Sequence, residues 1–313
     1  MDKSTVYFIH ALSPLHPGVG QGVGSVDLPV AREKATGIPY LPGSSVKGVL
    51  RDAAANAGWG AGKVKAIFGP DPVDASEHAG AAYFGDAKLL LLPVRSYAGV
   101  FAYATSPYLL RRFKREVEMA WGTPNGLPEL PGEVDDLNVA LVREGSELVT
   151  ASGKESKKVY LEDLDFQAQD REVVDRWENW LAEVTQGLDL PLAGRLLILH
   201  DDVMSFLLET ALEVVTRIRI NEETKTVAKG ALWFEENIPA ESLLYGLLSV
   251  APQSFGEVKD EEGTNGAKRL AAEEILKLLE GLLGQTLQFG GNATVGRGLS
   301  KMTFAKRSNG GAS

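Results

Sequence analysis

Three segments of the sequence combine residue types that can bind or cleave a phosphodiester. The first, HPGVGQGVGSVD, joins His16 to Asp27 through a glycine-rich stretch. RNA scission requires a deprotonated 2′-hydroxyl and a neutralised leaving oxygen, which acid–base side chains or a metal ion can supply. A loop carboxylate more commonly caps backbone amides, so both roles stay open. His16 and Asp27 are candidate catalytic residues.

The second segment, LPGSSVKGVLR at residues 41–51, resembles a phosphate-binding loop. It lacks the GxxxxGK[ST] spacing, which excludes an NTPase of that class. It predicts a helix over 42–57 with Ser44 or Ser45 as N-cap and Gly58 at its end. Because a helix N-terminus with hydroxyls and a lysine can hold an RNA phosphate, the candidate RNA contacts are Ser44, Ser45, Lys47 and Arg51. A capped helix with a surface lysine is the alternative.

The third segment is the glycine-rich loop GGNATVGRG near the C-terminus. Glycine lets backbone N–H groups approach phosphates closely. The segment contains no GxGxxG and no βαβ unit follows it, which excludes a dinucleotide-binding fingerprint. A plain turn explains this loop equally well when it is taken alone. Its candidate RNA contacts are Gly290, Gly291, Gly296, Arg297 and Gly298.

Composition excludes several other kinds of site. The chain of 313 residues has no cysteine, which excludes disulfides, thiolate zinc sites and a cysteine nucleophile. Only four histidines make a histidine-rich metal cage improbable. The N-terminus does not resemble a signal peptide, and no apolar stretch reaches the roughly 18 residues that span a bilayer. We therefore expect a cytoplasmic protein without membrane contact.

The distribution of charge allows a local nucleic-acid surface. A net charge of −10 argues against overall attraction to nucleic acid. The cations are nevertheless clustered, and a basic groove on an acidic body is consistent with this pattern, as are solvated helix faces. The three clusters are Arg111, Arg112, Lys114 and Arg115; Arg217, Arg219, Lys225 and Lys229; and Arg297, Lys301, Lys306 and Arg307.

Strands and helices alternate loosely, with long loops between them, which favours an α+β domain with large insertions over a doubly wound sheet. Ser106 and Pro107 predict the start of a helix, and Asp170 is the expected cap of a second one that ends at Gly187. Two β-rich runs over 213–234 flank a polar turn and predict a long hairpin. The other expected elements are strands at 5–12, 81–92 (broken by Gly85), 99–104 and 196–199, a loop at 256–266, a helix at 266–283 and a disordered tail from residue 306.

Taken in order, five segments resemble the RAMP superfamily of CRISPR proteins, in particular the Cmr-type backbone subunit of type III-B effector complexes. They are LSPLHPGVG, PYLPGSSVKGVLR, YFGDAKLLLLPVRS, FAYATSPYLL and FGGNATVGRGL. The resemblance covers about residues 5–305. It implies one domain over 1–305 with a ferredoxin-like palm (a modified RRM), a fingers-like region and a thumb β-hairpin at about 213–250. The chain departs from an ordinary RRM because it lacks an RNP-type aromatic motif, so we do not expect its sheet to read bases.

The same resemblance implies a function and a set of site residues. Such subunits form a helical filament with copies of themselves and other Cmr subunits along a guide RNA, and they cleave the complementary target RNA at regular intervals. Asp27 matches the family's catalytic aspartate, and Lys47 matches its guide-binding lysine. Asp27 is the expected ligand of a divalent metal, Mg²⁺ or Mn²⁺, with His16 as an acid or phosphate contact and Glu235 and Glu236 completing the site with a neighbour's Asp27. The thumb cations expected near phosphates are Arg217, Arg219, Lys225 and Lys229. Its apolar residues are expected to form a wedge or contact surface: Ile218, Val227, Leu232, Trp233 and Phe234. An ordinary hairpin packed on its own domain is the alternative.

Three other functions remain compatible with the sequence. The first is a non-catalytic scaffold that binds guide RNA, and Asp27 separates it from the nuclease because a scaffold needs no carboxylate there. The second is a stand-alone guide-processing RNase of the same superfamily. The third is an unrelated enzyme that acts on a small molecule.

Overall fold

The palm of the protein is an antiparallel sheet with the strand order β15-β1-β13-β4. In this computed structural model, which describes residues 3–20, 26–71, 78–152, 156–221, 223–258 and 268–306, α1 connects β1 to β4 and α6 lies between β13 and β15. This arrangement is the ferredoxin-like topology that the resemblance implied. The elements are β1 (Lys3–Ala11), α1 (Gly43–Asn56), β4 (Ala87–Arg95), β13 (Leu243–Val250), α6 (Ala272–Glu280) and β15 (Leu299–Phe304).

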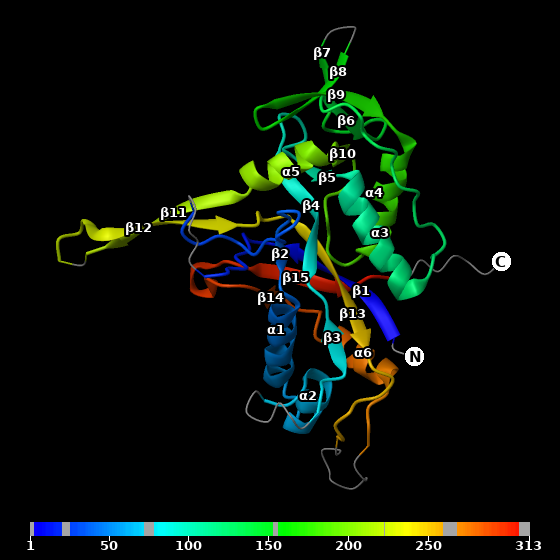
Figure 1. The fold of residues 1–313 in the computed structure, drawn as a ribbon, viewed down its shortest axis with the longest axis vertical. Coiled ribbons are helices and arrows are strands. Elements are labelled where there is room, and N and C mark those ends of the chain that lie inside the picture. The colour runs from blue at the N-terminus through cyan, green and yellow to red at the C-terminus, as the bar shows by residue number, and fades with distance from the viewer. Residues whose placement is uncertain are drawn as a thin grey trace.

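The sheet continues beyond β4 into an upper body, which forms the top of the molecule in Figure 1. The strand order there is β4-β5-β10-β6-β9-β8-β7, with parallel pairing between β5 and β10 and between β6 and β9. Its elements are β5 (Phe101–Thr105), α3 (Pro107–Trp121), β6 (Val139–Val142), β7 (Thr150–Ser152), β8 (Ser156–Leu161), β9 (Leu164–Asp170), α4 (Glu172–Val184), β10 (Leu196–Leu199) and α5 (Asp201–Thr210). Short elements complete the described chain: β2 (Tyr40–Leu41), α2 (Ala61–Phe68), β3 (Ala82–Phe84), β14 (Leu287–Gln288) and η2 (Ala293–Val295).

Both faces of the palm are covered. Ile9 packs in one core with Leu50 of α1 and Ile275 of α6. Phe8, whose side chain points the other way, packs in a second core with Phe113 of α3, and their ring centroids are 5.7 Å apart. An ordinary RRM leaves this second face open and stacks bases on it. Because α3 and α4 bury it here, the sheet does not offer a base-reading surface, as the missing aromatic motif suggested.

A two-stranded hairpin, formed by β11 (Glu213–Ile220) and β12 (Val227–Asn237), projects from the body on the left of Figure 1. The predicted hairpin is confirmed. Its expected extent to residue 250 is wrong, because residues 243–250 form β13 at the centre of the palm. The apolar pattern LLYGLLSV belongs to a buried strand with sheet neighbours on both sides, so the hairpin ends at Asn237.

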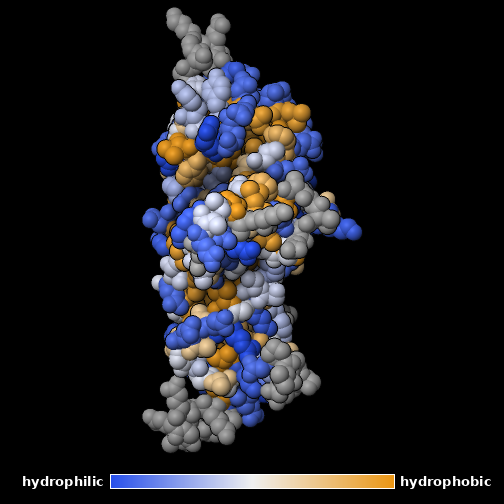
Figure 2. Space-filling model, turned by 90° about the vertical axis from the view of Figure 1, so that its left-hand side faces the viewer, coloured by the Kyte–Doolittle hydropathy of each residue, from blue (hydrophilic) through white to orange (hydrophobic). Residues whose placement is uncertain are grey.

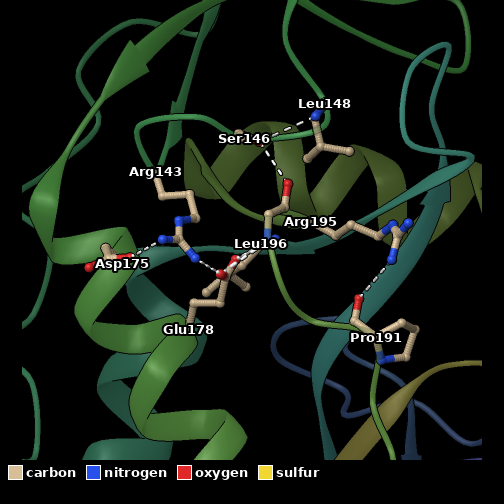
Figure 3. Close-up of polar contacts among 9 residues, drawn as sticks. Arg143, Ser146, Leu148, Asp175, Glu178, Pro191, Arg195 and Leu196 are labelled. Carbon is tan, nitrogen blue, oxygen red and sulfur yellow. Dashed lines mark hydrogen bonds and ion pairs between the residues drawn. The ribbon is translucent and has the colours of Figure 1, made fainter.

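A buried carboxylate fastens α4 to β10 in the upper body (Figure 3). Glu178 is 2% exposed, and it accepts hydrogen bonds from Arg143 at 2.6 Å and from the Gly194 N–H at 3.0 and 3.1 Å. Arg143 also pairs with Asp175 at 2.9 Å. A buried charge is tolerated only when it is paired and hydrogen-bonded. This network therefore fixes the residue that follows β6 and the loop that precedes β10.

Two predicted helix caps are wrong. Pro42 is the N-cap of α1, and the Gly43 N–H donates to Asp86 Oδ1 at 2.7 Å, so a remote carboxylate takes the role expected of Ser44 or Ser45. Arg171 is the N-cap of α4, because Asp170 is the last residue of β9. The predicted helix start at Ser106-Pro107 is confirmed: Pro107 is the first helical residue, and the Ser106 hydroxyl accepts from the Leu109 N–H at 3.4 Å.

The C-terminal third departs from its predicted boundaries. The helix expected over 266–283 is shorter, with α6 spanning Ala272–Glu280. Residues 259–266 of the loop expected at 256–266 lie outside the described residues. The same holds for residues 307–313 of the tail expected from residue 306. Within the ranges that the structure describes, no helix is long and apolar enough to cross a membrane.

Candidate active site

Asp27 lies at the base of the hairpin, on a segment that pairs with β12. The Leu28 N–H donates to the Phe234 carbonyl at 3.0 Å, and the Glu236 N–H donates to the Leu28 carbonyl at 3.0 Å. Asp27 itself is exposed, and its Oδ2 accepts the Phe234 N–H at 2.8 Å. The common role of a loop carboxylate is thus present. This hydrogen bond occupies Oδ2. No donor from the described part of the chain reaches Oδ1, so Oδ1 is available to a ligand or substrate.

His16 is buried beside this segment and has a defined tautomer. Its Nδ1 lies 2.7 Å from the Glu236 carbonyl oxygen. Because a carbonyl only accepts, Nδ1 carries the proton in this contact. The backbone at Gly18 approaches Nε2 so closely that a Cβ there would lie 2.6 Å away. His16 is therefore held between the hairpin and the backbone at Gly18.

Glu235 is a buried anion held by three donors. Arg217 Nε lies at 3.1 Å, Trp233 Nε1 at 2.9 Å and Asn292 Nδ2 at 3.3 Å from its carboxylate oxygens. Burial alone would raise the pKa of Glu235, but the hydrogen bonds from Trp233 and Arg217 and the nearby positive charge lower it below its ordinary value. Glu235 is consequently ionised at neutral pH, and its charge is already compensated.

Glu236 holds the Asp27 segment in place. Its Oε2 accepts the Val30 N–H at 3.0 Å, and its Oε1 pairs with Arg32 at 2.7 Å. The four residues expected at the catalytic centre, His16, Asp27, Glu235 and Glu236, therefore meet at the base of the hairpin. Asp27 alone among them is exposed.

The expected divalent metal lacks a ligand set in one chain. Glu235 and Glu236 are neutralised by arginines, and among the described residues no three His, Asp or Glu side chains are grouped to hold an ion. A lone Asp27 does not fit Mg²⁺ or Mn²⁺, which require several oxygen ligands.

The glycine-rich loop supports His16. The Gly291 N–H donates to the His16 carbonyl at 2.9 Å. Gly290 and Gly298 have φ of 74° and 76°, and a Cβ at these positions would lie 2.4 Å from the His16 oxygen and 1.8 Å from the Phe289 oxygen. The backbone approach expected toward RNA is made here toward protein. Gly296, at φ 78°, faces open space.

Three of the four arginines predicted to contact RNA are engaged within the protein, and the fourth is exposed. Arg297 pairs with Glu213 at 3.3 Å, with only 13% of its side chain exposed, and Arg217 pairs with Glu235. Arg51 binds the Gly69 carbonyl at 2.7 Å and Asp71 at 2.5 Å. These three arginines are engaged within the protein, whereas Arg219 near the end of β11 is exposed.

Lys47 is a half-buried cation on the first turns of α1. No ion pair reaches its ammonium from the residues that the structure describes, and Ser44 beside it is exposed while Ser45 is half-buried. Burial, and then the positive charge of Arg51, lower the pKa of Lys47. A cation with this environment is stabilised by an anionic ligand, since a phosphate would supply the missing counter-charge.

One face of the hairpin carries exposed apolar side chains. Ile218 pairs with Leu232 across the strands, and Phe234 lies two residues along on the same face. These three side chains are 48%, 55% and 36% exposed. Figure 2 looks toward this hairpin and shows apolar surface gathered at mid-height. Trp233, expected in the wedge, points to the opposite face and donates to Glu235, which places it in the support of the site.

Three residues that hold the site were not foreseen. Arg32 binds Glu236, Glu33 binds Arg112, and Asn292 binds Glu235. Arg32 and Glu33 follow Asp27 closely in sequence, which was the available signal. Their partners are 204 and 79 residues away, so no local pattern could identify the pairs.

Comparison with known proteins gives one consistent result. Residues 8–301 match the RAMP superfamily. The chain is 39% identical over 316 residues to the CRISPR system Cmr endoribonuclease Cmr4 of Pyrococcus furiosus, covering 99% of this chain and 98% of that protein. It is 26% identical over 257 residues to the CRISPR system CMR subunit Cmr4 of Saccharolobus solfataricus, covering 76% and 82%.

Solved structures agree with the sequence relatives. Oligomeric Cmr4 from P. furiosus superposes with a TM-score of 0.72 at 32% identity, covering 97% of this chain and 98% of the other. A chain of the type III-B Cmr-beta assembly bound to cognate target RNA has a TM-score of 0.68 at 21% identity, covering 96% of each, which shows a common fold. Together with the palm topology and the full-length match, these likenesses establish that the chain belongs to the RAMP superfamily and, within it, to the Cmr4 family.

Proposed function

We propose that this protein is a guide-RNA-binding filament subunit of a type III-B CRISPR ribonucleoprotein that cleaves complementary target RNA. Its P. furiosus relative is named an endoribonuclease, and that relative's structure is described as oligomeric. The observation that carries the proposal is the Asp27 carboxylate, which is fixed at the base of an exposed apolar hairpin with one oxygen hydrogen-bonded and the other accessible.

The chemistry follows from geometry. Attack of a 2′-hydroxyl on the adjacent phosphorus requires in-line alignment, which a stacked A-form duplex resists. The apolar face with Ile218, Leu232 and Phe234 is suited to enter between bases and displace one target nucleotide. Asp27 Oδ1 then accepts the 2′-hydroxyl proton as the O–P bond forms and the bond to the 5′-oxygen breaks. The leaving 5′-oxygen takes up a proton, and His16 is the candidate donor.

A divalent ion could bind at Asp27 only in the assembled complex. Its ligands beyond Asp27 would have to come from RNA phosphates or from a neighbouring subunit. Mg²⁺ or Mn²⁺ would supply charge neutralisation at the leaving oxygen. Cleavage that persists in excess EDTA would exclude a role for the metal and favour acid–base catalysis by side chains alone.

The decisive experiment is Asp27→Asn in a reconstituted complex with guide RNA and labelled complementary RNA. The amide keeps the size of the side chain and, through its oxygen, the hydrogen bond from the Phe234 N–H. We expect target binding and assembly to be unchanged and cleavage at regular intervals to be abolished. Full cleavage by the variant would exclude Asp27 from the chemistry and favour the non-catalytic scaffold.

A further inference from the structure

The segment that carries Asp27 is fixed by two arginines. Arg32 extends from it to the root of the hairpin, where Nη2 lies 2.7 Å from Glu236 Oε1 and 2.9 Å from the Leu208 carbonyl at the end of α5. Its Nη1 donates to the Gly37 carbonyl at 2.8 Å. Arg32 thus ties the segment to the hairpin and to the helix that leads into it.

The second arginine, Arg112, comes from α3 in the other core of the protein. Its Nη1 and Nη2 lie 2.9 and 2.5 Å from the two carboxylate oxygens of Glu33, a bidentate arrangement. Thr36 donates to Glu33 as well, at 2.7 Å. The Arg112 side chain is 11% exposed and that of Glu33 is 25% exposed, so water competes weakly for the pair. Bidentate arginine–carboxylate pairs fix orientation as well as distance.

These two contacts tie the Asp27 segment to two different parts of the protein, the hairpin and helix α3. The hairpin is a two-stranded projection, and such a ribbon is stable only through what it packs on. Helix α3 is anchored by Leu110, Phe113 and Val117, all at most 1% exposed. With the hairpin contacts alone, the segment would move with the hairpin. With Arg112 as well, its position is also set by the rigid body.

We propose that Arg112 is a positioning residue for target-RNA cleavage, which through Glu33 holds Asp27 at a fixed distance from the scissile phosphate. This inference rests on the proposed function, because it assigns Asp27 to the chemistry. A displacement of about 1 Å at a reacting group can cost on the order of 100-fold in rate. The pair therefore matters for the rate of the bound complex and leaves the affinity for RNA unaffected.

The test compares variants from both sides of the pair in the reconstituted complex. Arg112→Gln removes the guanidinium, and Glu33→Gln removes the negative charge while leaving α3 unchanged. Arg112→Lys keeps the charge without the bidentate geometry and should fall between them and the original protein. The matched control is Arg176→Gln, which breaks an exposed arginine–glutamate pair on α4 with a 2.7 Å contact to Glu172.

We expect both glutamine variants to lower the single-turnover cleavage rate constant about tenfold to 100-fold. The Kd for target RNA and the final fraction cleaved should equal those of the control. A purely structural role would instead reduce the final fraction cleaved at an unchanged rate constant, and that result overturns the proposal. Asp27→Asn measured in parallel separates the two claims. If it cleaves fully, the proposed function fails, whereas if it is inactive and the glutamine variants cleave at the original rate, only the positioning role fails.

Discussion

At the residue scale, Asp27 has one carboxylate oxygen engaged in the fold, which leaves the other for the proposed chemistry. Asp27 uses Oδ2 to accept the Phe234 N–H at 2.8 Å. Glu235 and Glu236, although acidic and adjacent, are held by Arg217 and Arg32 and cannot act as free bases. The availability of a carboxylate is therefore set by which donors reach it. Lys47 presents the converse case, a half-buried cation with no acid from the described residues.

Lys47→Ala should weaken guide-RNA binding and reduce its salt dependence. One lost phosphate contact lowers the slope of log K against log[salt] by about 0.7 for a single strand. Affinities measured over a series of salt concentrations test this expectation. Lys277→Ala, which removes an exposed lysine of α6, is the matched control and should leave the slope unchanged. Equal slopes for Lys47→Ala and the original protein would refute the contact.

At the element scale, the hairpin combines a supported root with an unsupported apolar face. Its root is held by Glu213–Arg297 and Arg217–Glu235 pairs at 3.3 and 3.1 Å. Further out, Ile218 and Leu232 face solvent. Exposed apolar side chains on a projecting ribbon mark a contact surface rather than a core. In the upper body, by contrast, a charged group such as Glu178 is buried, and it is paired with Arg143.

Leu232→Asp should preserve folding and guide binding while suppressing target cleavage. The side chain is 55% exposed, so the substitution creates no cavity. Unstacking a base step costs a few kcal/mol, and a charged hairpin face cannot offset it, so we expect cleavage to fall about tenfold or more. The readout is the ladder of products from a labelled target. Met119→Asp, at an exposed position on α3, is the control, and equal ladders for the two variants would show that the hairpin is not a wedge.

Glu178→Ala should destabilise the upper body strongly. It removes the acceptor of the buried Gly194 N–H and one of the two acidic partners of Arg143, which keeps Asp175 at 2.9 Å, and a buried donor left unsatisfied costs about 1–3 kcal/mol. Glu172→Ala breaks an exposed pair with Arg176 and should cost much less, because water screens that pair. Denaturant unfolding of both variants measures the difference. Similar small losses would mean that the Glu178 network contributes little stability.

At the scale of the whole molecule, the palm is a ferredoxin-like sheet whose two faces are both buried. The helices α1 and α6 cover one face, and α3 with α4 covers the other. On the proposed function, RNA would contact helix ends, loop edges and the projecting hairpin, because both faces of the palm are covered. The net charge of −10 is consistent with contacts limited to such local sites.

Much of this could be predicted from local patterns. The alternation and length of apolar runs located β1 and the hairpin, and Ser106-Pro107 located the start of α3. These signals succeed because backbone conformation depends mainly on near neighbours. His16 and Asp27 could be singled out for the same reason, since their loop is defined by its own glycines. The resemblance to the RAMP superfamily added the palm and the thumb.

Tertiary structure alone decided which groups are engaged. It assigned the α1 cap to Asp86, ended the hairpin at Asn237, turned Trp233 to Glu235 and matched Glu33 with Arg112, which lies 79 residues away. A hydrogen bond or ion pair forms with whichever donor the fold delivers, and that choice depends on the whole chain. Sequence therefore identified the candidate residues, and the fold determined that, of His16, Asp27, Glu235 and Glu236, Asp27 is the one that is exposed.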